Sequence, residues 1–136
     1  MRNIAQLIIH CSATKEGKDF DVETIRDWHV NGNGWSDIGY HYVIKLDGTI
    51  QEGRKENRIG AHAKGNNRHS IGICYIGGLD SDLEPKDTRT EKQKESLLKL
   101  LNELKDRYPK STVYGHNDFS SKACPCFNAK KEYEKL

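Results

Sequence analysis

The sequence predicts an α/β fold in which one central mixed β-sheet is flanked by helices. Short runs of β-branched and aromatic residues alternate, imperfectly, with segments of helical period. The pair Asp47-Gly48 between two such runs indicates a β-hairpin, which adds an antiparallel pair to the sheet. A length of 136 residues is typical of one domain. We therefore expect a single domain over residues 1–136.

The expected strands are marked by apolar runs that end at turn residues. The first run, QLIIHCS, is rich in Ile and is typical of a buried strand, and the run SIGICYI is closed by Gly77-Gly78. The run YHYVIKL leads into the hairpin signal. On this basis we expect strands over residues 6–12, 40–46, 49–52, 70–76 and 112–116.

The first expected helix covers residues 22–30 and is capped by Asp21. Ile25 and the pair Trp28-His29 should lie on its inner face. The run NGNG that follows tolerates positive φ and ends the helix.

The longest expected helix covers residues 91–108, where Thr90 and Gln93 can form a capping box. Its apolar stripe repeats at helical spacing, and Pro109 stops it. A short helix over residues 128–135 closes the chain, and the polar residues 80–89 predict a surface loop. The stripe consists of Leu97, Leu101, Leu104 and Tyr108, widened by Leu98 and Leu100.

Composition argues against several classes of protein. The 22 Lys and Arg residues nearly balance 20 Asp and Glu, and a net charge of +2 is too small for a dedicated nucleic-acid-binding protein. No apolar stretch approaches the roughly 18 residues of a membrane span. The N-terminal residues show no secretory signal. We therefore expect a chain that is made in the cytoplasm, with neither nucleic acid nor membrane as partner.

Four cysteines occur, and we expect reduced thiols or metal ligands rather than disulfides. Cys124 and Cys126 are too close in sequence for an unstrained bond with each other. Cys11 should face the core if its neighbour His10 faces a cleft, because adjacent strand residues point to opposite sides. Cys74 lies within an apolar run and should be a packing residue.

Three potential metal ligands stand at or near the ends of expected strands. His10 ends the first strand, His116 follows the last, and Cys124 comes eight residues later. Two imidazoles and a thiolate suit zinc, and three protein ligands leave a fourth position open, as in catalytic sites. The spacing alone leaves open that these are ordinary buried histidines and a core thiol, because no local motif such as HExxH is present.

Seven short motifs in order carry a resemblance that extends from about residue 4 to residue 128. They resemble the zinc-dependent N-acetylmuramoyl-L-alanine amidases, the family of amidase-type phage lysozymes and peptidoglycan-recognition proteins. Each motif is weak alone, and their common order makes the resemblance specific. The motifs are His10-Cys11-Ser12-Ala13-Thr14, Gly39-Tyr40-His41-Tyr42, Ile44–Thr49 with Glu52-Gly53-Arg54, His62-Ala63, Ser70-Ile71-Gly72-Ile73 with Gly77-Gly78, Gly115-His116 and Lys122-Ala123-Cys124-Pro125.

The resemblance implies a zinc-binding amidase domain over residues 1–136, with one zinc ion per chain at the floor of a groove. His10, His116 and Cys124 match the family's three zinc ligands. Cys126 follows the matched ligand Cys124 closely and has no expected role beyond that of a reactive bystander.

The resemblance also implies roles for three further residues. Tyr40 and Lys122 match the catalytic Tyr and Lys, and His62 matches a cleft-lining His that binds substrate. Amide hydrolysis needs charge stabilisation and a proton for the leaving amine. A fixed lysine charge and a tyrosine hydroxyl can supply them.

The implied activity is hydrolysis of the amide bond between N-acetylmuramic acid and L-alanine in peptidoglycan, by a monomer. A phage endolysin released through a holin-like pore fits a chain without an export signal. A cytoplasmic amidase that recycles wall fragments is the competing role. Two other classes stay open: a non-catalytic peptidoglycan-binding module of the same fold, and a small zinc-binding regulatory or nucleic-acid-binding protein.

Overall fold

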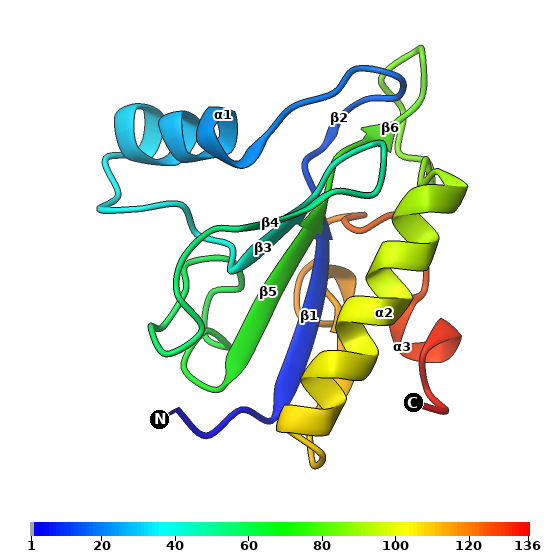
Figure 1. Cartoon of the computed structure of the whole chain (residues 1–136). Helices are drawn as coiled ribbons and strands as arrows, with labels where there is room; N and C mark the ends of the chain where they lie inside the picture. The colour runs from blue at the N-terminus through cyan, green and yellow to red at the C-terminus, as the bar shows by residue number, and fades with distance from the viewer. Residues whose placement is uncertain (1) are drawn as a thin grey trace.

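The computed structural model describes residues 2–136, which are built around a five-stranded mixed sheet (Figure 1). The strand order is β4-β3-β5-β1-β7. The pairs β3–β5, β5–β1 and β1–β7 are parallel, and β3–β4 is antiparallel. The predicted fold class is confirmed. The strands are β1 (Gln6–Cys11), β3 (Tyr42–Ile44), β4 (Ile50–Glu52), β5 (Ser70–Tyr75) and β7 (Thr112–Gly115).

All five strands are shorter than the sequence predicts, and a second small sheet was not expected. In the hairpin between β3 and β4, the Lys45 N–H donates to Thr49 O at 2.9 Å. This bond pairs residues 45 and 49, so the loop consists of the three residues 46–48 rather than the two that were predicted. Gly48 supplies the positive φ of +89° that such a loop needs. The second sheet pairs β2 (Thr14–Lys15) with β6 (Gly78–Leu79).

The first helix differs from its prediction at its C-terminal end. Asp21 caps α1 (Val22–Asp27) by accepting from Thr24 N–H, as expected. The chain then widens into a π-helical turn, η1 (Trp28–Gly32), which breaks the 3.6-residue period. Trp28 is therefore 38% exposed rather than on the inner face, whereas Ile25 is buried.

The long helix α2 (Glu91–Arg107) begins with the predicted capping box between Thr90 and Gln93. The expectation for Leu98 is wrong: its side chain is 44% exposed, because position 98 lies outside the stripe that faces the sheet. The residues of that stripe that are buried against the sheet are Leu97, Leu100, Leu101 and Leu104.

Two cores lie on opposite faces of the sheet. One packs α2 and α3 (Ala129–Glu132) against side chains such as Leu7 and Ile9 of β1. The other packs α1 against Val43 and Cys74. Figure 1 shows α2 and α3 on one side of the sheet and α1 across from them. α3 is shorter than the predicted helix over residues 128–135 and begins after its cap, Asn128.

The loop over residues 80–89 is largely exposed, as predicted, but it ends in a buried cation. The Arg89 side chain is 2% exposed, forms ion pairs with Asp87 and Glu132, and lies 3.4 Å from the centre of the Phe127 ring. This contact fixes the loop to the C-terminal segment. Within residues 2–136 no helix is long and apolar enough to cross a bilayer.

Candidate active site

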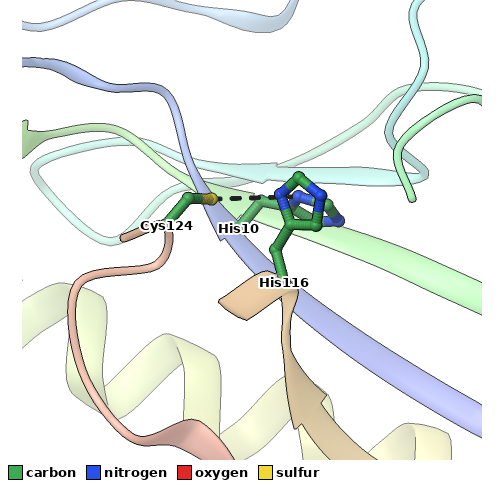
Figure 2. Close-up of side chains that lie close together, drawn as sticks. All are labelled: His10, His116 and Cys124. Carbon is green, nitrogen blue, oxygen red and sulfur yellow. Dashed lines mark hydrogen bonds between the residues drawn. The ribbon is translucent and has the colours of Figure 1, made fainter. Parts of the chain in front are cut away.

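The candidate site lies where the parallel strands β1 and β7 end (Figure 2), and His10 points to the face of the sheet opposite to the α2 core that holds Ile9 and Cys11. His10 is the penultimate residue of β1, and His116 opens the 3₁₀ turn η2 (His116–Asp118) directly after β7. The register pairs Ile9 with Gly115, so the residues that follow both lie side by side. Cys124 comes from the loop before α3. Sites at the carboxyl ends of parallel strands are a general property of such sheets.

One ligand atom from each of these three residues lies within 4.8 Å of the other two. The Cys124 Sγ is 3.9 Å from His10 Nδ1, the contact dashed in Figure 2. The backbone N–H of Cys11 donates to Cys124 Sγ at 3.2 Å. Two imidazoles and one thiolate at this separation fit the donor set and size of a zinc site.

The second nitrogen of His10 is also engaged. His10 Nε2 lies 2.9 Å from His62 Nδ1, and His62 Nε2 lies 3.2 Å from the Ser70 hydroxyl. Gly72 makes room for this arrangement, since a Cβ there would come within 2.5 Å of the His62 ring. The row His10–His62–Ser70 leaves Nδ1 of His10 free to face Cys124.

Burial keeps these imidazoles neutral. It lowers the pKa of His10 well below its ordinary value and lowers that of His62 to about 3. Burial is also the main cause of the lowered pKa of His116, and the charge of Lys122 adds to it. Neutral imidazoles are the form that binds metals, so the site is ready for a cation at neutral pH.

Tyr40 and Lys122 lie on the same cleft as the three candidate ligands. The Tyr40 ring is 5.1 Å from the His10 ring, and burial raises the pKa of its hydroxyl well above the usual value, so Tyr40 stays protonated at neutral pH. Lys122 is exposed at the rim.

The cleft has a volume of about 260 Å³, and all six predicted site residues line it. It also contains two aromatic residues that the sequence analysis did not single out as site residues, His29 and Trp35, whose rings are 4.7 Å apart. The only feature of the sequence that could have indicated a role for Trp35 in the site is its position directly after the glycine-rich run at residues 31–34.

Arg54 is a further positioning residue that sequence reasoning missed. It is buried, and its guanidinium donates to Ile38 O at 2.9 Å and to Ile59 O at 2.7 Å. These bonds join the segment before Tyr40 to the segment before His62. The sequence analysis uses the motif Glu52-Gly53-Arg54 only as part of the resemblance to the amidase family and assigns no role to Arg54.

Cys11 and Cys74 are core residues, as predicted. All four cysteines are free, Cys11 lies in the α2 core, and Cys74 is fully buried in the core on the opposite face. Cys126 is half-buried, and burial raises the pKa of its thiol to about 12.

Comparison with known proteins agrees with the motifs and the fold. The sequence profile of the N-acetylmuramoyl-L-alanine amidase family matches residues 1–127. The chain belongs to this family. The endolysin of Klebsiella phage KP32 is 43% identical over 131 residues, which cover 96% of this chain and 86% of that protein.

Solved structures show the same likeness. The amidase LysC from Clostridium intestinale superposes with a TM-score of 0.80 at 31% identity, covering 96% of this chain and 82% of that one. Bumblebee PGRP-SA gives a TM-score of 0.82 at 30% identity, covering 100% of this chain and 83% of that one. The chain is thus an amidase of the endolysin and peptidoglycan-recognition superfamily, and peptidoglycan is its substrate.

Proposed function

We propose that the chain cleaves the bond between N-acetylmuramic acid and L-alanine with one zinc ion held by His10, His116 and Cys124. The convergence of these three ligand atoms within 4.8 Å is the observation that carries the proposal. His10 stands 106 positions before His116 in the sequence, so its convergence with the other two ligands is not a by-product of local spacing. When bound, zinc supplies Lewis-acid polarisation of the scissile carbonyl and a water activated at neutral pH.

Tyr40 and Lys122, which both line the cleft, act on the substrate. The buried Tyr40 hydroxyl holds its proton and donates a hydrogen bond to the scissile carbonyl oxygen. The Lys122 ammonium at the rim stabilises the negative charge that develops on the same oxygen. Two side chains of the chain itself would therefore stabilise the negative charge that develops on the carbonyl oxygen during amide cleavage.

His62 acts through His10. With Nδ1 of His10 turned to the ligand cluster, its Nε2 carries the proton and donates to His62 Nδ1. His62 then donates from Nε2 to the Ser70 hydroxyl, so the row of hydrogen bonds fixes the tautomer of both rings. Direct contact of His62 with substrate, which the resemblance implies, stays a prediction.

The biological setting that we propose is that of an endolysin: a monomeric single-domain enzyme, residues 1–136, which reaches the cell wall through a pore made by another protein. The similarity to the phage KP32 endolysin supports this role over wall recycling. Comparing activity on intact sacculi with activity on soluble muropeptides separates the two roles, because a recycling enzyme prefers the fragments.

Product analysis tests the proposed reaction. Digestion of purified peptidoglycan should release free amino groups of L-alanine without new reducing sugar ends, and chelation should abolish and zinc restore this release. Glycosidases use paired carboxylates and would yield reducing ends instead. Disaccharide-peptides as the main product, or full activity after complete zinc removal, would refute the proposal.

A further inference from the structure

A second pair of sulfur atoms lies beside the candidate zinc site and takes no part in it. The Sγ atoms of Cys11 and Cys126 are 4.0 Å apart. Cys11 directly follows His10, and Cys126 comes two residues after Cys124. We propose that Cys11 and Cys126 form a disulfide when the folded protein meets a disulfide oxidant. The inference does not depend on the proposed zinc chemistry.

The surroundings of the pair bring the two thiols together. Cys126 Sγ lies 3.2 Å from Gly78 O, and a Cβ at position 78 would come within 2.4 Å of Cys11 Sγ. Only a glycine at this position leaves room for the Cys11 thiol between β1 and β6. The two sulfurs need to approach from 4.0 Å to about 2 Å to bond. Rotation of both side chains about the Cα–Cβ bond can supply a movement of this size.

Of the other two cysteines, Cys74 faces away from this pair, whereas Cys124 lies beside Cys11. Cys124 Sγ accepts from the backbone N–H of Cys11 and points to His10. Cys74 is buried in the core on the opposite face of the sheet from Cys11. Because Cys124 Sγ is engaged by the backbone of Cys11 and by His10, Cys126 is the proposed disulfide partner of Cys11.

An oxidant can reach the pair from one side. Cys126 is half-buried and lines an open surface hollow together with Asn117, Asp118 and Phe127, whereas Cys11 is only 5% exposed. With oxidised glutathione, Cys126 Sγ first bonds to one glutathione sulfur and the other glutathione leaves as a thiol. Cys11 Sγ then attacks Cys126 Sγ and releases the second glutathione thiol. Two electrons and two protons pass from the protein to one oxidant molecule.

Oxidation would join the two segments that carry His10 and Cys124. Peptidoglycan lies outside the cytoplasmic membrane, where the periplasm and extracellular space oxidise thiols. The proposed bond would thus form where the substrate is, and it would tie the loop that carries Cys124 to β1. The loop closed by the bond spans nearly the whole chain, since the two residues are 115 positions apart.

Mass spectrometry of the zinc-loaded full chain, incubated with oxidised glutathione, tests the proposal. The protein should lose the mass of two hydrogen atoms, and the count of alkylatable thiols should fall by two from four. Trypsin should then yield peptide 3–15 joined to peptide 123–130, with fragmentation between residues 124 and 125 placing the bond on Cys126. The melting temperature should rise by about 10 °C and return on reduction.

Variants make the outcome decisive. Cys126→Ser and, independently, Cys11→Ala should prevent both the mass loss and the melting shift, whereas Cys74→Ala should keep both. Bound zinc should stay constant throughout. A stable glutathione adduct without an internal bond would overturn the proposal. So would a bond to Cys124 accompanied by zinc loss, or four free thiols after prolonged oxidation.

Discussion

Replacing His62 by alanine should weaken zinc binding without removing any ligand. His10 Nε2 is buried, and its bond to His62 Nδ1 is 2.9 Å long. Without His62 the His10 N–H has no partner, and an unsatisfied buried donor costs about 1–3 kcal/mol. Because every 1.4 kcal/mol is about tenfold in affinity, the zinc dissociation constant should rise by roughly 10- to 100-fold.

Competition between the protein and a chromophoric chelator measures this dissociation constant directly. His62→Asn is the informative partner variant, because Asn Oδ1 can take the place of His Nδ1 and accept the same bond. It should recover most of the lost affinity. His69→Ala is the matched control, since His69 is an exposed histidine away from the cleft. An unchanged dissociation constant in His62→Ala, or equal losses in the alanine and asparagine variants, would refute the reasoning.

Three further predictions concern catalysis, metal ligation and pH. Lys122→Ala and Tyr40→Phe should keep zinc and fold but lower turnover by about 10²- to 10³-fold, measured by release of peptide from peptidoglycan; near-normal rates with full zinc would contradict their roles. Cys124→Ser should lose most of the bound zinc while Cys126→Ser keeps it, measured by elemental analysis; the reverse pattern would show that the ligand is misassigned. Burial lowers the pKa of His41 to about 4 from its ordinary 6.5, so the unfolded chain takes up a proton before the folded one does. His41 should therefore account for about 3 kcal/mol of the stability that the metal-free protein loses between pH 6.5 and pH 4, and urea unfolding should show a shallower pH dependence for His41→Gln than for the unchanged protein; equal slopes would contradict this.

The architecture could be predicted because local signals and tertiary structure agree. The capping box at Thr90 and the apolar stripe predict a helix, and the folded protein has α2 there. The apolar runs at residues 6–12 and 70–76 predict strands, and the folded protein has β1 and β5 there. The exposed Trp28 could not be foreseen, because a helical period does not reveal a change from α to π geometry. The pair β2–β6 rests on two residues from each strand, too few for any periodicity.

The candidate site was predicted by a different route. His10, His116 and Cys124 gained meaning only from the order of the motifs, because their spacing in sequence is compatible with ordinary core residues. The contact between His10 and His62 depends on a ring orientation that Gly72 permits, and no sequence pattern encodes such an orientation. The positioning role of Arg54 could not be predicted for a similar reason. Its guanidinium is buried and donates to backbone carbonyls, but nothing in the sequence distinguishes it from a cation on the surface.

The site draws one candidate ligand from the first strand and another from the last loop, 114 positions apart. During synthesis every strand of the sheet is therefore complete before Cys124 leaves the ribosome. A chain interrupted after η2 would contain the entire sheet, His10 and His116, and yet only two of the three proposed ligands. The enzyme on this assignment gains its metal, and with it the capacity to damage a cell wall, only after the segment that follows the last strand of the sheet has been synthesised.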